Sequence, residues 1–268
     1  MKKSTILKFL RQFRLLYFAD WLRFQIQKVR VRSTNREFRK KYPTVTLPPD
    51  YLLYETFQLN YFKYYVESKD TASELRDYFS KYIELSNAKI LDWGCGPGRV
   101  IRHMPEVFGK DCELYATDYN PVSIRWCSEN ISGIHFNLNS LEAKLPYDDN
   151  FFDALYGLSI FTHLSLPMHF DWYKELRRVT KPGGIMLFTT HGDSFKVKLT
   201  DGELSQYNKG ELVERGKAKE GHRIYIAFHP LAFMKKLFSE DTILEHKVEY
   251  PEKGKWLPQD VWIVRKNG

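Results

Sequence analysis

The stretch that most constrains the fold is residues 89–101, which read Lys-Ile-Leu-Asp-Trp-Gly-Cys-Gly-Pro-Gly-Arg-Val-Ile. It predicts a short apolar strand, a loop that holds Gly94, Gly96 and Gly98, and a helix that begins near Arg99. Glycines let the backbone approach a ligand closely, and a helix N-terminus offers unpaired N–H groups. A dinucleotide-binding loop needs its third glycine at the position of Arg99, so that fingerprint fails. The segment therefore predicts a different ligand loop, with a plain glycine turn of an α/β protein as the alternative.

Composition indicates a folded protein with one large domain and additions. The chain has 268 residues, of which 43% are hydrophobic and 16% aromatic, enough to bury an ample core. Its cysteines form no Cys-x-x-Cys pair, and their odd number leaves one unpaired in any disulfide scheme. This favours a reducing, cytoplasmic setting and no metal site. The three are Cys95, Cys112 and Cys127.

From residue 71 onward, helical and strand patterns alternate. Strands are expected over 88–93, 112–117, 134–138, 152–158, 185–190, 242–250 and 260–264, and helices over 71–85, 99–108, 121–130 and 167–179. The alternation predicts an α/β fold, Rossmann-like and doubly wound, with a mostly parallel seven-stranded sheet. Ligands of such sheets bind beyond the carboxyl ends of the strands.

Two segments stand outside this alternation. Residues 1–45 form a basic amphipathic N-terminal helical arm with a proline-punctuated linker, and residues 46–268 form the expected domain. Within that domain, residues 192–228 are polar with scattered glycines and predict an inserted flap. Aromatic residues crowd 51–66, where a helix would either belong to the core or line a cofactor or sugar site.

The net charge of +8 is concentrated in the arm. Residues 1–41 hold 13 lysines and arginines against 2 acidic residues, so the rest of the chain is mildly acidic. A basic arm on an acidic body does not favour nucleic acid as the main partner. Apolar residues recur at helical spacing over 5–31, with basic residues between them. Such a helix either contacts an anionic membrane peripherally or packs on the body or on another copy.

No window of 18 uncharged apolar residues occurs, so no segment is expected to span a membrane. The apolar stretch 6–21 is interrupted by charges and lacks a cleavage site, so we expect it to be retained. The protein is accordingly expected in the cytoplasm, with a peripheral position at the inner membrane face as the finer expectation.

A second signal follows the second predicted strand. Asp118 stands at its carboxyl end, 24 residues after Gly94. A carboxylate there can accept hydrogen bonds from both hydroxyls of a ribose, and the ring of Tyr119 could lie against a purine. The alternative is a helix cap before Pro121, which Asn120 could supply equally well.

Two further blocks complete a known pattern. Leu145-Pro-Tyr-Asp-Asp-Asn-Phe-Phe-Asp153 precedes a strand, and Lys181-Pro-Gly-Gly184 precedes the next one. With the glycine loop and Asp118, the order over about residues 71–190 resembles class I S-adenosylmethionine (SAM)-dependent methyltransferases of the small-molecule and saccharide type. The resemblance implies that SAM is the cofactor.

The resemblance also implies roles for individual residues. The methionine part of SAM would lie against Asp92, Gly94, Gly96 and Gly98. Cys95 in the same loop and Leu158 are also expected to bind the cofactor. Asp118 would bind the ribose, with Tyr119 beside the adenine, and Asn139, Ser140 and Leu141 would meet the adenine edge. The family commonly carries an acid in this last loop, where this chain has Asn139.

Methyl transfer to an oxygen benefits from a general base, and histidine suits neutral pH. His163 follows the fourth predicted strand, His191 ends the fifth, and His229 begins the helix after the flap. Each is a candidate base and each could instead be a hydrogen-bonded structural histidine.

The chain lacks the Asn/Asp-Pro-Pro-Tyr/Phe motif after its fourth strand and has no Pro-Cys pair. Both absences disfavour methylation of nucleic acid bases and leave a hydroxyl or carboxyl acceptor. The prediction is O-methylation of a saccharide or another small hydroxylated acceptor, as in polysaccharide biosynthesis, with a lipid-linked acceptor as the finer expectation. The alternatives are an RNA methyltransferase steered by the arm and a SAM-binding regulator without turnover.

Overall fold

The computed structural model describes residues 16–57, 59–216, 220–221, 224–250 and 257–268. They fall into two compact units, residues 1–71 and 72–268. The predicted boundary at 45/46 lies inside the first of them. No helix in the described parts of the chain combines the length and the apolar run needed to cross a bilayer.

The first unit holds short helices around an aromatic cluster. Its buried side chains include Val31 and Phe38 from the arm and Leu53, Tyr54 and Tyr64 from the aromatic segment, which explains why arm and segment form one unit. The aromatic segment is two pieces, because Leu59 adopts a φ of 63° that ends the first helix. The helices are α2 (Leu16–Arg30), α3 (Arg32–Lys41) and α4 (Asp50–Phe57), followed by a π-helical turn over Lys63–Glu67.

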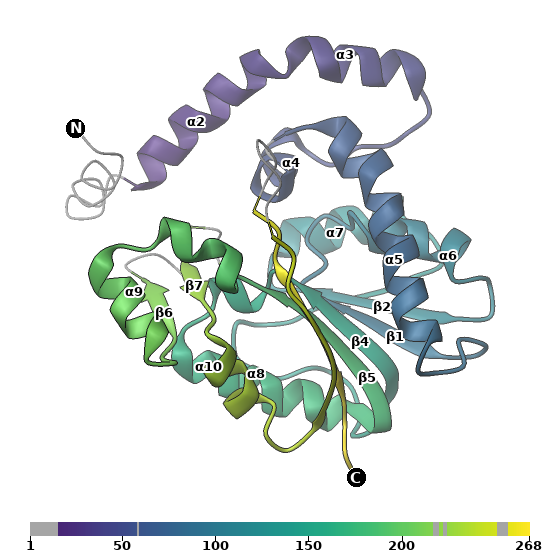
Figure 1. Cartoon of the computed structure of the whole chain (residues 1–268). Coiled ribbons are helices and arrows are strands. Elements are labelled where there is room, and N and C mark those ends of the chain that lie inside the picture. The colour runs from purple at the N-terminus through teal and green to yellow at the C-terminus, as the bar shows by residue number, and fades with distance from the viewer. Residues whose placement is uncertain (1–15, 58, 217–219, 222–223, 251–256) are drawn as a thin grey trace. The chain divides into compact units, whose positions relative to one another are not determined.

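The second unit is built on a seven-stranded sheet in the order β3-β2-β1-β4-β5-β9-β8, as Figure 1 shows in part. The first five strands in this order are parallel, whereas β9 runs antiparallel to both β5 and β8. The mostly parallel sheet confirms the predicted fold class. The strands are β1 (Lys89–Trp93), β2 (Glu113–Asp118), β3 (His135–Leu138), β4 (Phe152–Leu158), β5 (Thr180–Thr190), β8 (Thr242–Lys247) and β9 (Asp260–Arg265).

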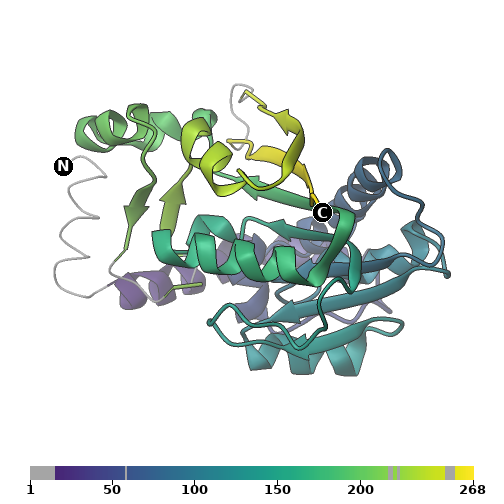
Figure 2. The same ribbon diagram turned by 90° about the horizontal axis from the view of Figure 1, so that it is seen from below.

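Helices cover both faces of this sheet, which explains why its central strands are buried apolar runs (Figures 1 and 2). One face packs against α5, α6 and α7 through Phe79, Met104 and Ile124. The other packs against α8 and α10 through Trp172 and Phe233. The helices are α5 (Ser68–Ser80), α6 (Met104–Val107), α7 (Pro121–Asn130), α8 (Leu166–Val179) and α10 (Leu231–Leu237).

Two local predictions were wrong. The helix expected over 99–108 is a 3-10 turn over Ile101–His103 followed by the short α6, because Pro105 has no N–H to continue a helix begun upstream. The turn expected at Lys181–Gly184 lies within β5 as a bulge, where the register against β4 shifts between Phe152 and Ala154.

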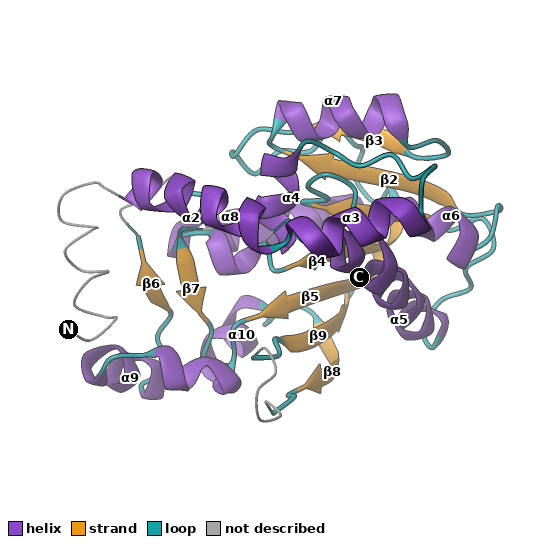
Figure 3. Ribbon diagram, turned by 90° about the horizontal axis from the view of Figure 1, so that it is seen from above, coloured by secondary structure: helices purple, strands orange, loops and turns teal. Residues whose placement is uncertain are grey.

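The segment expected to be a flap, residues 192–228 and called here the insertion, has secondary structure of its own. It holds a 3-10 helix (Asp193–Lys198), α9 (Asp201–Asn208) and a hairpin of β6 (Val213–Arg215) with β7 (Ile226–Phe228). Figure 3 shows the hairpin beyond the carboxyl end of β5. Ligands of parallel sheets bind at this edge, so the insertion lies where an acceptor would bind.

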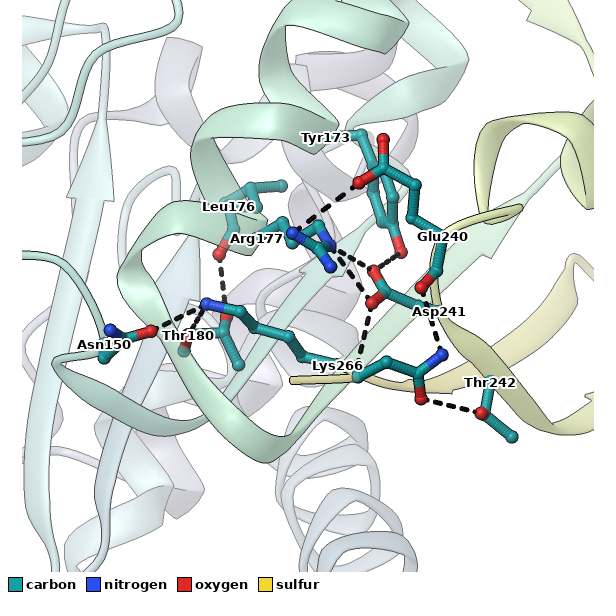
Figure 4. A network of polar contacts seen from close by, with 10 residues as sticks. Asn150, Tyr173, Leu176, Arg177, Thr180, Glu240, Asp241, Thr242 and Lys266 are labelled. Carbon is teal, nitrogen blue, oxygen red and sulfur yellow. Dashed lines mark hydrogen bonds and ion pairs between the residues drawn. The ribbon is translucent and has the colours of Figure 1, made fainter.

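A polar network ties the antiparallel strands to the rest of the sheet (Figure 4). The buried carboxylate of Asp241 accepts hydrogen bonds from Arg177 Nε at 3.1 Å and from the Tyr173 hydroxyl at 2.6 Å. Nearby, Lys266 Nζ donates to Asn150 Oδ1 and to the carbonyl of Thr180, both at 2.7 Å. The network thus joins α8, the start of β5 and the end of β9.

We expect Asp241→Ala to lower the free energy of unfolding by about 3 kcal/mol, because it removes one partner of a buried ion pair. Glu240→Ala is the matched control: Glu240 contacts the same Arg177 at 3.6 Å, but its side chain is 74% exposed. The control should cost less than about 1 kcal/mol. Urea denaturation of both variants checks this, and equal losses would contradict it.

Candidate functional site

The glycine loop after β1 is held by the end of β2. The carbonyl of Thr117 accepts hydrogen bonds from the N–H groups of Gly94 and Cys95, at 2.8 and 2.9 Å. Gly94 has a φ of 79°, and a Cβ there would lie 2.2 Å from Ile160 Cδ1. Any other residue would adopt this positive φ with strain and would displace the Ile160 side chain, so the tight turn that the sequence predicts favours glycine here.

Asp118 connects the loops that follow β1 and β2. One carboxylate oxygen accepts from Gly96 N at 2.9 Å and the other from Asn120 N at 2.8 Å. Burial raises the pKa of Asp118 above its ordinary value, and these two hydrogen bonds oppose the rise. The helix cap is made by Asn120, whose side chain accepts from Val122 N at 3.0 Å. Asp118 is therefore not the cap of α7.

The loop after β3 lies next to Asp118. Asn139 N donates to the carbonyl of Asp118 at 3.1 Å, and Asn139 Nδ2 donates to the carbonyl of Ser140 at 2.6 Å. Its Oδ1 atom is buried and has no hydrogen-bond donor within the described parts of the chain. Burying such an acceptor without a donor is costly. The arrangement leaves this oxygen to a donor that a ligand would bring.

A cavity opens between these loops. Seven of the fourteen predicted site residues line it together. Among the other seven, Asp92 is buried in β1, Cys95, Gly96 and Gly98 belong to the glycine loop, and Leu158 packs against the core at the end of β4. The remaining two, His191 and His229, lie outside the lining. The lining residues are Trp93, Gly94, Asp118, Tyr119, Asn139, Ser140, Leu141, Ile160, His163, Leu164, Trp172 and Gly221.

Five lining residues were not predicted from the sequence: Trp93, Ile160, Leu164, Trp172 and Gly221. Gly221 is the one that comes from a distant part of the chain. It comes from the insertion, and its N–H donates to the carbonyl of His163 at 2.9 Å. A Cβ at Gly221 would lie 2.9 Å from Leu141 and 3.0 Å from Tyr119. No motif spacing links a glycine of the insertion to Leu141 and Tyr119, which lie 80 and 102 residues earlier in the sequence, so only the folded chain reveals the contact.

Two of the candidate histidines are oriented by β7 and the residue before it. His163 Nδ1 lies 2.8 Å from the carbonyl of Tyr225, and His191 Nδ1 lies 3.0 Å from the carbonyl of Ala227. A carbonyl can only accept, so Nδ1 carries the hydrogen in both rings and Nε2 carries the lone pair. Burial, followed by the charge of His163, lowers the pKa of His191 to about 3. His191 is therefore neutral at physiological pH.

The third candidate, His229, lies in a different environment. It is buried, and its Nε2 lies 3.0 Å from Nε2 of His169, a histidine of α8 that the sequence did not single out. Because His169 Nδ1 donates to the carbonyl of Ser165 at 2.7 Å, the hydrogen between the two rings belongs to His229. Burial lowers the pKa of His169 to about 4 and also lowers that of His229. Both rings are neutral in the core.

Comparison with known proteins identifies the domain that carries this site. Residues 90–184 match the family model described as "Methyltransferase domain". The chain contains a class I SAM-dependent methyltransferase domain. This class uses SAM as its cofactor. The matched segment runs from β1 into β5 and includes the glycine loop, Asp118 and His163.

The similarity to two relatives covers mainly this domain and less than half of the chain. An uncharacterized methyltransferase of Schizosaccharomyces pombe is 35% identical over 40% of this chain, and the malonyl-[acyl-carrier protein] O-methyltransferase of Salmonella typhimurium is 34% identical over 38%. The matches cover only 41% and 39% of those two relatives. Phthiotriol/phenolphthiotriol dimycocerosates methyltransferase 1 of Mycobacterium ulcerans is 25% identical over 67% of this chain and 70% of its own.

A solved structure shares the fold. A SAM-dependent methyltransferase from Methanosarcina mazei superposes with a TM-score of 0.55 at 19% identity, covering 71% of this chain and 97% of its own. The residues in the cavity also fit SAM. The buried Asn139 oxygen suits a donor such as the adenine amino group, and the Asp118 carboxylate suits ribose hydroxyls.

We expect Asp118→Ala to weaken SAM binding by about 1.5–3 kcal/mol, because paired hydroxyls would lose their charged acceptor. Isothermal titration calorimetry measures the loss. Asp118→Asn, which keeps an acceptor oxygen for the backbone, should fall between wild type and Asp118→Ala. Unchanged affinity in Asp118→Ala would refute the ribose role.

Asp92 gives the methyltransferase domain a pH-dependent stability. Burial raises the pKa of Asp92 to about 7, although Tyr156 and Arg99 oppose the rise. The unfolded chain ionises Asp92 near pH 4, so the stabilising effect of the neutral carboxyl is complete below that pH and is lost as the pH rises to about 7.

The unfolding free energy of wild type minus that of Asp92→Asn should therefore fall by up to about 1.4 kcal/mol per pH unit between pH 4 and 7 and stay level above. Urea denaturation of the ligand-free proteins at pH 5, 6, 7 and 8 measures this difference. Parallel pH profiles for the two proteins would contradict the assignment.

Proposed function

We propose that the protein transfers the methyl group of SAM to a hydroxyl oxygen of a small acceptor, a saccharide or another hydroxylated molecule, with His163 as the general base. The observation that carries the proposal is that His163 lines the cofactor cavity while its Nδ1–H is held by the Tyr225 carbonyl at 2.8 Å. The Nε2 atom of His163 then carries the lone pair and can take a proton.

When bound, SAM supplies a methyl group on a positively charged sulfur, which is already a good leaving group. The chain then has to align the acceptor, exclude water and accept one proton. In this proposal His163 Nε2 takes the hydroxyl proton as the oxygen–methyl bond forms. The carbonyl of Tyr225 keeps the ring in the tautomer that can do this and stabilises the imidazolium that results.

His191 serves as a second acceptor-side group in the same proposal. It is oriented by the next carbonyl on the same side of the strand, that of Ala227, and stacks on Phe195 with a centroid distance of 4.0 Å. A neutral imidazole with a lone pair at Nε2 can accept a hydrogen bond from an acceptor hydroxyl. His229, paired with His169 in the core, would act through packing around these two rings.

The names of the relatives support a small acceptor. One relative is named as a malonyl-[acyl-carrier protein] O-methyltransferase, and another as a phthiotriol/phenolphthiotriol dimycocerosates methyltransferase. Several others are named as ubiquinone/menaquinone C-methyltransferases. Apart from the acyl-carrier protein, these named acceptors are small molecules or lipids. We therefore extend the proposal to a lipid-linked acceptor, reached from the cytoplasmic side of an anionic membrane.

We expect His163→Ala to lower kcat by about two to four powers of ten while SAM affinity changes by less than about threefold. His135→Ala, which removes an exposed histidine on β3, is the control and should keep wild-type turnover. S-adenosylhomocysteine release measures the rate. Full turnover in His163→Ala would move the base to another residue.

The acceptor class is tested by incubating the protein with SAM and, separately, free saccharides, lipid-linked saccharides and RNA. Release of S-adenosylhomocysteine with a hydroxylated saccharide supports the proposal. Release with RNA alone favours an RNA methyltransferase, and tight SAM binding without turnover on any class favours a regulator.

A further inference from the structure

Helix α2 packs one of its faces against other described residues of its unit. Asp20, Phe24 and Val31 lie on the inner face, where the Tyr54 hydroxyl donates to Asp20 Oδ1 at 3.1 Å and the Phe24 ring lies 5.2 Å from that of Tyr54. The inner face therefore has its partners within the first unit. This leaves the opposite face to be explained.

The opposite face is apolar and exposed. Its five large side chains are 46–76% exposed, and two of them, Phe18 and Trp21, stack with ring centroids 6.1 Å apart. At about 100° per residue these side chains fall within an arc of about 140°, centred opposite the inner face. The five are Phe18, Trp21, Leu22, Ile26 and Val29, called here the outer stripe.

Basic side chains flank the outer stripe on both sides. In projection Arg23 and Arg30 lie along one edge and Lys28 along the other, and all three are exposed. Lys28 is half exposed beside Asp50 at 3.6 Å, so its ammonium is near water. From residue 18 to residue 41 the chain has eight basic side chains against two acidic ones. A long basic side chain can keep its charge at a surface while its stem lies along apolar groups.

We propose that the outer stripe docks on the surface of an anionic phospholipid bilayer. The aromatic and aliphatic side chains enter the boundary between headgroups and acyl chains, and the flanking cations meet the lipid phosphates. This surface belongs to the arm and does not depend on the methyl-transfer proposal. The docking face of α2 is the outer stripe, because the inner face already packs against other residues of the first unit.

Charge and side-chain type favour a bilayer over other occupants. RNA would gain from the cations, but Leu22, Ile26 and Val29 offer no stacking surface for bases. A second copy of the chain would bring the basic edges of two outer stripes together, and like charges in contact oppose that pairing. A bilayer of anionic lipid satisfies the apolar stripe and both basic edges at once.

The test is co-sedimentation of the full chain with vesicles of phosphatidylcholine containing 30% phosphatidylglycerol, without SAM or acceptor. Phe18→Ser/Ile26→Ser should lower the partition coefficient at least tenfold, as should replacing the vesicles with pure phosphatidylcholine. The matched control is Val197→Ser/Leu231→Ser, which removes two apolar side chains of the second unit that are 78% and 46% exposed. The control should bind like wild type.

Circular dichroism checks that both double variants are folded. Arg23→Gln/Arg30→Gln should weaken binding to the anionic vesicles and reduce its dependence on salt. Equal binding by Phe18→Ser/Ile26→Ser and wild type would overturn the proposal. So would a dimer in analytical ultracentrifugation that Phe18→Ser/Ile26→Ser dissociates while vesicle binding is absent, or salt-sensitive capture of RNA without vesicle binding. Because no methyl donor is present, a negative result leaves the proposed methyl transfer untouched.

Discussion

The Thr117–Asp118 end of β2 organises the loops beside the cavity of the methyltransferase domain. The Thr117 carbonyl accepts hydrogen bonds from the first two N–H groups of the glycine loop. The Asp118 carboxylate accepts hydrogen bonds from Gly96 N and Asn120 N. Two loops from neighbouring parallel strands are thereby fixed to each other before a ligand arrives. In a preformed site of this kind, ligand binding loses little free energy to ordering of the backbone.

Strand and helix patterns were predictable wherever burial dictates them. Central parallel strands are covered on both faces, so β1 and β4 read as continuous apolar runs, and α7 begins at the Pro121 that the sequence marks. The long helix after the glycine loop was predicted wrongly, since periodicity alone does not register the missing N–H of Pro105. Across the proline-rich linker, Phe38 packs with Leu53 and Tyr64, a contact that periodicity does not register.

The candidate site also has parts that the sequence predicts and parts that it does not. Gly94, Asp118 and Asn139 follow strand ends, and the topology of a parallel sheet brings such positions together, so their meeting was predictable. The carbonyls of Tyr225 and Ala227 and the contact of Gly221 were not, because they depend on how the insertion folds back over the sheet edge. Backbone carbonyls have no sequence signature, so a histidine's tautomer can be assigned only from the folded chain.

Gly221 has a consequence for how two ligands would communicate. The insertion meets Tyr119 and Leu141 at the cofactor cavity through this glycine, and a few residues later it supplies the carbonyl that orients His163. A movement of Gly221 and Tyr225 that favours SAM binding would also change the orientation of the His163 imidazole. Thermodynamic reciprocity then requires that occupancy on the acceptor side change the donor's affinity by the same factor. One short stretch of chain would thus make the two halves of a methyl transfer cooperative.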